Sequence, residues 1–350
     1  MNFHTQLINW YSDNKRSLPW RDTDNPYFIW LSEIILQQTQ VKQGLPYYEA
    51  FVKHFPTVFD LANASEEHVL KLWQGLGYYS RARNLHASAK YIAKELNGVF
   101  PSTYEDIKKL KGVGDYTASA IASIAFKEPK AVVDGNVYRV LSRYFGIKTA
   151  INSTSGIKEF KALAQELIAK EQPHIYNQAI MEFGALQCTP KTPNCELCPL
   201  KNGCVALKEN LINELPVKLK KTKVTKKYFN YMVCVDDKQN ILFEKRQGKG
   251  IWQNLYQFPL IESEKSLTAE EFDKLRFDSL LTKPIGYDYA LYNESDKVHK
   301  LSHQHLYTKF WIIEVKDTLT DCYIPLQDIH KYPVPVLIGD FIEEFNFEAL

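Results

Sequence analysis

The chain of 350 residues has no long apolar run, little cysteine and almost no net charge, and each shortage excludes a class of protein. No segment approaches the roughly eighteen uninterrupted apolar residues that a transmembrane helix needs. The first twenty residues carry Lys15, Arg16 and Pro19 but lack the apolar stretch of a signal peptide. We therefore expect a cytoplasmic protein that makes no contact with a membrane.

Only six cysteines are present, and four of them lie within residues 188–204. A reducing cytoplasm makes disulfides unusual, so this cluster favours a metal site over covalent cross-links. Four thiolates in one loop suit tetrahedral zinc or a [4Fe–4S] cluster, and the single close C-x2-C pair favours the cluster without excluding zinc. The candidate ligands, spaced C-x6-C-x2-C-x5-C, are Cys188, Cys195, Cys198 and Cys204.

The net charge of +2 conceals an uneven distribution. Counting Lys and Arg against Asp and Glu gives +9 for residues 1–227 and −7 for residues 228–350. A basic first part suggests a polyanionic partner, although this signal alone does not identify one. The length and the apolar content of 45% are typical of a globular protein with two domains.

Residues 1–215 are predicted to be mostly helical. Asn25 and Pro26 form a helix cap with a proline in the first turn, and the apolar-periodic run after them predicts a helix that continues to residue 41. Asp134, just before Gly135, is a second candidate helix cap. No strand is expected in this part of the chain.

The second part of the chain has a different texture. Residues 216–227 hold six lysines and no acid, which is typical of a solvated linker; an arm that contacts phosphates is the alternative. Residues 228–350 predict a separate α+β domain. Its signals are a hairpin turning at 236–239, a helix over 268–281 and a strand over 305–315.

The stretch LKGVGDYTASAIASIAF, residues 110–126, places Gly112 and Gly114 in a tight turn between two helical patterns. Such a turn directs backbone N–H groups at the start of the second helix toward an anion. It would hold a nucleic-acid backbone without reading its sequence. Taken alone, the pattern is more often a plain connection between helices.

Together with VDGNVYRVLSR at 133–143 and the cysteine spacing, this hairpin resembles that of the helix-hairpin-helix base-excision DNA glycosylases. In the bifunctional lyases of that superfamily a lysine follows the hairpin glycines by two residues, whereas here Tyr116 stands there and cannot form a Schiff base. Further stretches are similar to the adenine-DNA glycosylase (MutY) family: LPWR at 18–21, WLSEIILQQTQV at 30–41, GLGYYSRARNLH at 75–86 and NQAIMEFGAL at 177–186.

The resemblance implies a monofunctional, adenine-specific DNA N-glycosylase, a hydrolase of base-excision repair with a [4Fe–4S] cluster. The expected partner is double-stranded DNA that contains an 8-oxoguanine:A or G:A mispair, bound by a monomer associated with the nucleoid. A bifunctional pyrimidine glycosylase and lyase is one alternative, which Tyr116 argues against. A binding module without activity is the other, which the presence of Glu33 and Asp134 argues against.

Two carboxylates are the candidate catalytic groups. Glu33 lies in an apolar helical pattern that would raise its pKa toward the range of a general acid, with an exposed helix position as the alternative. Cleavage of an N-glycosidic bond needs a protonated leaving base and a stabilised sugar cation. The resemblance implies that Glu33 protonates adenine and then helps to activate water, and that Asp134 stabilises the cation. It also implies that Tyr116 and Asn136 align these two groups.

The resemblance assigns further residues to a flipped adenine and to DNA. The implied adenine pocket consists of Trp20, Arg21, Leu36 and Gln178, the last standing where some relatives carry Glu. The implied DNA contacts are Gln38, Thr39, Leu76, Tyr78, Gly112 and Gly114, with Gln38 and Tyr78 inserted into the base stack. Core packing and surface polarity are the alternative explanation for several of these residues.

Residues 228–350 resemble the Nudix-like domain of the same family but lack the glutamate-rich box that a hydrolytic Nudix domain needs to hold magnesium. The segment HKLSHQHL, residues 299–306, is similar to the family's loop that contacts 8-oxoguanine, with Leu301 in place of the usual Phe. The resemblance implies that Ser302 hydrogen-bonds the lesion and that His303 supports this contact. A plain turn, or a metal site formed by histidines of this segment, is the alternative.

Overall fold

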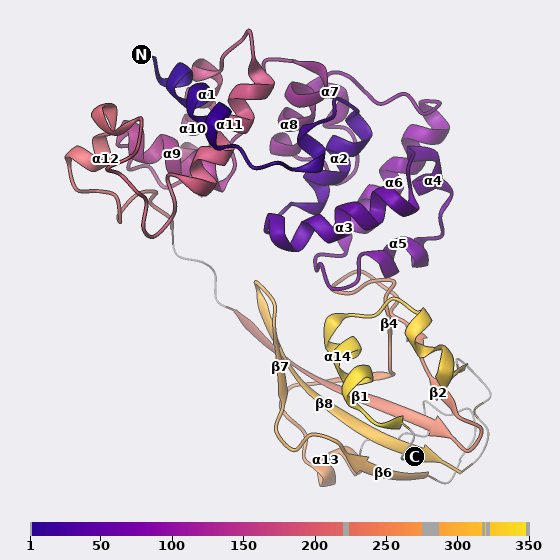
Figure 1. The fold of residues 1–350 in the computed structure, drawn as a ribbon. Helices are drawn as coiled ribbons and strands as arrows, with labels where there is room; N and C mark the ends of the chain where they lie inside the picture. Colours follow the sequence, from indigo (N-terminus) through magenta and orange to yellow (C-terminus); the bar gives the residue numbers. More distant parts are fainter. Residues whose placement is uncertain (1, 220–223, 275–286, 317–318, 320–322, 348–350) are drawn as a thin grey trace. The chain divides into compact units, whose positions relative to one another are not determined.

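The computed structural model describes residues 2–219, 224–274, 287–316, 319 and 323–347 (Figure 1). The chain divides into two units, which we call the helical unit (residues 1–63 and 84–220) and the sheet unit (residues 64–83 and 221–350). Within the described residues, no helix is both long enough and apolar enough to cross a membrane.

The helical unit consists of helices joined by loops, as predicted. Their bounds are α1 Phe3–Asn14, η1 Pro19–Arg21, α2 Pro26–Ile35, α3 Val41–His54, α4 Val58–Asn63, α6 Ser80–Glu95 (which begins in the sheet unit), α7 Tyr104–Ile107, α8 Asp115–Phe126, α9 Gly135–Phe145, α10 Thr154–Leu167, α11 Pro173–Leu186, η2 Lys201–Gly203 and α12 Val205–Lys208.

Local capping chemistry sets the starts of two helices that carry the site. The Asn25 side chain accepts a hydrogen bond from the Tyr27 amide at 2.9 Å, and Pro26 occupies the first turn of α2. The Asp134 side chain accepts from the amides of Asn136 and Val137 and so caps α9. Both caps confirm the sequence-based predictions.

The predicted helix through residue 41 is wrong at its C-terminal end. Helix α2 stops at Ile35, and Gln38 takes a left-handed conformation with φ of 56° before α3 begins. The Gln37 side chain leaves the helical path and donates to Thr117 Oγ1 at 3.1 Å. The apolar run ends at Leu36: residues 37–40 are Gln, Gln, Thr and Gln, and Gln38 and Gln40 are exposed, so the hydrophobic pattern gives no support for a helix there.

Helix α11 is central to the helical unit, where it packs against α1, α8 and α9, while α2 packs against α8. Chain segments more than a hundred residues apart in the sequence therefore lie side by side, as Figure 1 shows for α1 and α11. The predicted catalytic residues lie on or beside these helices.

The sheet unit combines a sheet with short helices, which confirms the predicted α+β class. Its elements are α5 Glu66–Leu72, β1 Thr225–Asp236, β2 Asn240–Leu242, β3 Glu244–Lys245, β4 Tyr256–Gln257, β5 Leu260–Ser263, α13 Ala269–Asp273, β6 Tyr287–Leu291, β7 Lys297–Lys300, β8 Gln304–Val315, β9 Tyr323–Pro325, η4 Leu326–Lys331 and α14 Val336–Glu344.

The long strands β1 and β8 pair in parallel at the centre of the main sheet, whose order is β6-β8-β1-β2-β9. The predicted hairpin at 236–239 is confirmed by the antiparallel pairing of Val235 with Ile241. Strand β1 begins at Thr225, inside the segment expected to be a linker. Of the helix expected over 268–281, α13 is described, and residues 275–281 lie outside the described residues.

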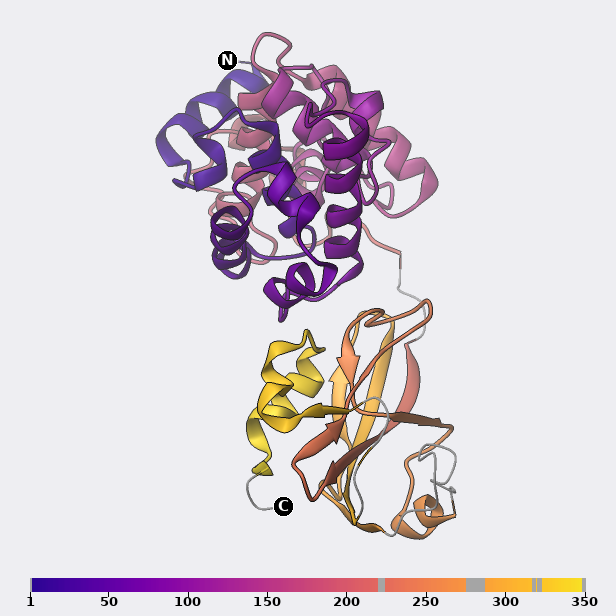
Figure 2. The same ribbon diagram turned by 90° about the vertical axis from the view of Figure 1, so that its right-hand side faces the viewer.

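Consecutive residues of β8 anchor helices on opposite faces of the sheet (Figure 2). The ring of Phe310 stacks on Phe341 of α14, with centroids 4.1 Å apart. The ring of the next residue, Trp311, stacks on Phe272 of α13 at 3.6 Å. Because side chains alternate along a strand, the two helices cover the two faces. Phe272 and Trp311 belong to one apolar core, and Phe310 and Phe341 are fully buried with Phe258 on the other face.

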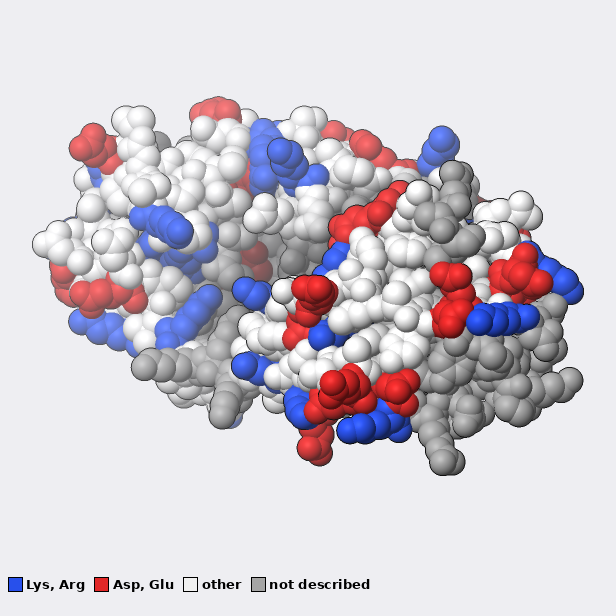
Figure 3. All heavy atoms as spheres, turned by 90° about the horizontal axis from the view of Figure 1, so that it is seen from below, with Lys and Arg blue, Asp and Glu red and all other residues white. Residues whose placement is uncertain are grey.

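Charged side chains do not form one large patch of a single sign on the face drawn in Figure 3, where basic and acidic groups are interspersed. In the sheet unit several of them pair, as Glu262 does with Lys227 and Arg246. Exposed pairs of this kind contribute little to stability.

Candidate active site

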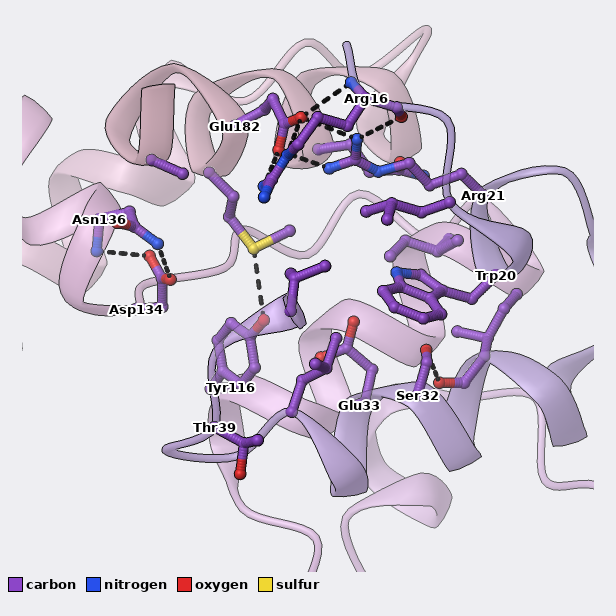
Figure 4. A pocket seen from close by; sticks show the side chains of 18 residues that line it. Arg16, Trp20, Arg21, Ser32, Glu33, Thr39, Tyr116, Asp134, Asn136 and Glu182 are labelled. Carbon is purple, nitrogen blue, oxygen red and sulfur yellow. Dashed lines mark hydrogen bonds and ion pairs between the residues drawn. The ribbon is translucent and has the colours of Figure 1, made fainter. Parts of the chain in front are cut away.

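One cavity of about 180 Å³ lies in the helical unit between η1, α2, α8, α11 and the loop that precedes α9 (Figure 4). All eight residues predicted to catalyse the reaction or hold adenine line it, as does Thr39, a predicted DNA contact. Together these residues are Trp20, Arg21, Glu33, Leu36, Thr39, Tyr116, Asp134, Asn136 and Gln178. The structure thus brings the predicted catalytic set and the predicted adenine pocket together.

Glu33 projects into this cavity from α2 and is only 9% exposed. Burial raises the pKa of Glu33 to about 7, since a charged carboxylate is poorly solvated there. The Tyr116 side chain and the charge of Arg21 lower it, whereas the Asp134 carboxylate raises it further. Glu33 therefore keeps a proton at mildly acidic pH and can donate it near neutrality.

Asp134 is held by its role as a helix cap. Its Oδ1 accepts from the amides of Asn136 at 2.9 Å and Val137 at 2.8 Å, and its Oδ2 accepts from Asn136 Nδ2 at 2.8 Å. Burial raises the pKa of Asp134, and these hydrogen bonds oppose the rise. The cap therefore fixes a largely desolvated carboxyl group at the edge of the cavity.

Asn136 is oriented in turn by Arg139, a residue that the sequence analysis did not single out. Arg139 Nη2 donates to Asn136 Oδ1 at 2.9 Å, and Arg139 Nε donates to the Cys188 carbonyl at 2.7 Å. One guanidinium thus joins the cysteine loop to the pair formed by Asn136 and Asp134. One indication of this role was present in the sequence: Arg139 lies about one helical turn after the capping residue Asp134, in the stretch VDGNVYRVLSR.

Tyr116 lies on α8, the second helix of the hairpin. Its side chain reaches the cavity beside Glu33. Its hydroxyl donates to Met181 Sδ at 3.3 Å. Burial raises the pKa of Tyr116, so the hydroxyl keeps its proton and acts as a donor.

The adenine-pocket residues are fixed by groups behind them. Tyr11 donates its hydroxyl proton to Gln178 Oε1 at 2.8 Å, which leaves the Gln178 amide nitrogen as the donor at this position. Trp20 packs edge-on against Tyr48. Arg21 is bound by Glu182, a cavity residue that the sequence analysis did not name.

The hairpin forms as predicted, with Gly112 at φ of 79° and Gly114 capping α8. Asn84 lies so close to Gly112 that an added Cβ would approach its Cβ to 2.8 Å. Glycine is therefore required at this turn both by the backbone conformation and by the neighbouring side chain. The Gly114 position leaves open space beside the first amides of α8.

The predicted DNA contacts fall in both units. Gln38 and Thr39 lie in the turn after α2, in the helical unit. Leu76 and Tyr78 belong to the sheet unit, where they line a cavity of about 470 Å³ with Trp252. Ser302 and His303, the predicted lesion contacts, line the same cavity.

Within that cavity, Ser302 Oγ lies 3.3 Å from His303 Nδ1, and Tyr78 is 48% exposed. Two polar side chains, of Ser302 and His303, and the aromatic ring of Tyr78 thus line one cavity of the sheet unit. Among the described residues, no three His, Cys, Asp or Glu side chains are placed to hold a single metal ion.

The four predicted cysteine ligands line one small cavity of about 30 Å³ beside α9. Arg143 borders it and donates to the carbonyls of Thr189 at 2.7 Å and Pro190 at 3.0 Å, which orders the first part of the loop. Its Nη1 lies 3.5 Å from Cys188 Sγ. Arg143 and Arg139, both buried, therefore tie the loop to the core of the helical unit.

Two known protein families match two separate parts of this sequence. The family described as "HhH-GPD superfamily base excision DNA repair protein" matches residues 31–173, and the family described as "NUDIX domain" matches residues 230–344. A structure of a thermostable thymine-DNA glycosylase superposes with a TM-score of 0.55 at 29% identity, over 59% of this chain and 95% of that one.

Two of the relatives named adenine DNA glycosylase match this chain over different lengths. The protein of Buchnera aphidicola subsp. Schizaphis graminum is 36% identical over 98% of this chain and 99% of its own length. The human protein is 46% identical over 58% of this chain and 39% of its own length. The predicted family is confirmed by the full-length match: this chain belongs to the adenine DNA glycosylase family.

Proposed function

We propose that this protein excises adenine mispaired with 8-oxoguanine or guanine and does not cleave the DNA strand itself. The observation that carries the proposal is the buried Glu33, whose pKa is raised to about 7, in one cavity with Asp134. A proton donor and a carboxylate are the two groups that cleavage of an N-glycosidic bond requires. The names of its relatives point to adenine as the base.

In the proposed reaction, a flipped adenine enters the cavity and Glu33 transfers its proton to a ring nitrogen of the base. The bond between the base and C1′ then breaks, and its electron pair leaves with the neutral adenine. The positive charge that develops on the sugar is stabilised by the Asp134 carboxylate. A water molecule adds to C1′ and returns a proton to Glu33, which restores the starting state.

The residues that line the cavity support the proposed absence of strand cleavage. A lyase needs an amine that attacks C1′ and forms a Schiff base. None of the described residues lining this cavity is a lysine. Tyr116 occupies the position, two residues after the hairpin glycines, at which the bifunctional lyases carry their lysine. Tyr116, with its raised pKa, instead serves as a hydrogen-bond donor to the reacting groups.

The hairpin at Gly112 and Gly114 supports binding to double-stranded DNA. Its backbone amides at the start of α8 can bind a phosphate group without reading the base sequence. We propose that one copy of the protein binds one mispair, as an enzyme associated with the nucleoid.

We further propose that Cys188, Cys195, Cys198 and Cys204 hold a [4Fe–4S] cluster. All four side chains line one cavity, and one pair of them, Cys195 and Cys198, has the close C-x2-C spacing that zinc sites usually have twice. That arrangement favours a group larger than one zinc ion. The cluster would cross-link the loop, and Arg139 would pass the order of the loop on to Asn136.

The cavity in the sheet unit is the proposed site for 8-oxoguanine. Ser302 and His303 offer hydrogen-bond donors and acceptors, and Tyr78 offers a ring on which a base can stack. 8-Oxoguanine differs from guanine at one edge, by a carbonyl at C8 and a proton on N7, so one or two hydrogen bonds are enough to discriminate between them.

Replacing Ser302 and His303 together by Ala is expected to reduce the preference for 8-oxoguanine:A over G:A by roughly tenfold, because the lost hydrogen bonds serve only the lesion. The measurement is the ratio of single-turnover adenine release from the two duplexes. His305→Ala, a nearby histidine that does not line the cavity, is the matched control. Full discrimination by the double variant would show that the lesion is read elsewhere, for which Gln38, Thr39 and Leu76 are the candidates.

The function itself is tested with the wild-type protein and a duplex that contains one 8-oxoguanine:A pair. Free adenine should be released, and hot alkali should then break the strand at the adenine position. Borohydride should trap no covalent complex. Borohydride trapping with strand breaks before alkali treatment would establish a lyase instead.

A further inference from the structure

Glu182 is a buried charge for which the proposed reaction has no direct use. It projects from α11, and its side chain is 1% exposed. Two arginines surround it, and together they donate five hydrogen bonds to its carboxylate. Burial alone would raise the pKa of Glu182, but these hydrogen bonds outweigh burial and hold it at about 2. Glu182 is therefore ionised throughout the physiological range.

The two arginines differ in their surroundings. Arg16 binds Glu182 through its backbone amide, Nε and Nη2, but its side chain is 37% exposed, so water screens its charge. Arg21 binds through Nη1 at 3.0 Å and Nη2 at 2.7 Å, and its side chain is only 13% exposed. The Arg21 guanidinium also lies over the ring of Tyr11 and donates to the Arg16 carbonyl at 2.9 Å. Arg21 is thus a poorly screened cation held in one orientation.

This cation lines the same cavity as Glu33 (Figure 4). A bare guanidinium beside a general acid is unfavourable for catalysis, because it stabilises the ionised form and so removes the proton that must be transferred. The other charged or titratable groups that act on Glu33 are Tyr116, which also favours ionisation, and Asp134, which opposes it. Of the described residues that line this cavity, Glu182 is the acidic one that pairs with Arg21.

We propose that Glu182 is a positioning residue that compensates the charge of Arg21, so that Arg21 can contact the base while Glu33 keeps its proton. The inference rests on the proposed function, since it assumes that Glu33 is the acid of the reaction. A purely structural role, in which Glu182 only ties residues 16–21 to α11, is the competing account. The two accounts differ in what they predict for pH dependence.

The test is the pH dependence of single-turnover adenine release by the full chain with an 8-oxoguanine:A duplex. Glu182→Gln keeps the shape of the side chain but removes its charge. We expect the alkaline limb of the profile to move to lower pH by at least about half a unit, because Arg21 then favours ionised Glu33. Arg21→Gln should move the limb in the opposite direction, since it removes the cation. Glu182→Asp keeps the charge and should leave the limb in place, even where the rate falls.

A limb that stays at the wild-type pH in both Glu182→Gln and Arg21→Gln, with a rate lowered equally at every pH, would overturn the inference in favour of the structural role. Because the two variants predict shifts of opposite sign, either variant that folds distinguishes the two roles on its own. The circular dichroism spectrum and the Tm of each variant identify which ones fold. A wild-type protein that releases no adenine would contradict the proposed function instead.

Discussion

Glu33→Gln is expected to lower single-turnover adenine release by at least about 10³-fold, because an amide cannot donate the proton that the leaving base needs. Asp134→Asn is expected to lower it by about 10²- to 10³-fold, through loss of the charge that faces the sugar cation. Both substitutions preserve shape, and Asn caps helices as well as Asp does, so α9 should remain intact. The measurements are the rate of adenine release and the affinity for the same duplex, which should be unchanged.

The matched control is Glu49→Gln on α3, which makes the same chemical change at an exposed position outside the cavity. It should release adenine at the wild-type rate. Wild-type turnover by Glu33→Gln would remove Glu33 from the mechanism, and weakened duplex binding would show instead that the carboxyl groups serve recognition.

Cys198→Ser is expected to lower the iron content of the purified protein by at least about tenfold, because one of the four thiolate ligands is lost. The wild-type protein, purified anaerobically, should be brown and contain close to four irons per chain if the proposed cluster is present. Loss of the cluster should also weaken duplex binding, because the cysteine loop would lose its order. Arg139 and Arg143, which bind this loop, would then no longer be held in place.

Leu197→Ser provides the control for this change. Leu197 is the neighbouring residue in the same loop and is 77% exposed, so the substitution introduces the same side chain without touching a ligand. It should keep its iron. Zinc in stoichiometric amount and no iron in the wild-type protein would contradict the proposed cluster and favour the tetrahedral alternative.

Features set by local chemistry were predictable from the sequence. The caps at Asn25 and Asp134 depend on side chains that bond amides two or three residues away, and both were identified correctly. The apolar setting of Glu33 follows from its neighbours one turn away along α2. The turn at Gln38 was missed, because the Gln37 side chain beside it bonds the hairpin at Gly112 and Thr117, far away in the sequence.

Long-range pairs could not be inferred from single residues. Glu182 and Arg21 are separated by 161 positions in the sequence, and only the packing of α11 in the helical unit brings them together. The Tyr11 contact with Gln178 spans 167 positions. In the same way, no pattern in residues 64–83 indicated that this helical segment would group with the sheet unit, to which Arg83 is tied by a hydrogen bond from its Nη1 to the Gln253 carbonyl.

The central claim is that a buried, protonated Glu33 drives the release of adenine. Its most direct test is the single-turnover rate of adenine release by the wild-type protein, measured from mildly acidic to alkaline pH with a saturating 8-oxoguanine:A duplex. Because burial raises the pKa of Glu33 to about 7, the acid is present below that pH and is lost as the pH rises through it. The account predicts a rate that falls across neutrality, with no such fall in the residual rate of Glu33→Gln. A wild-type rate that stays constant or rises over this range would contradict it.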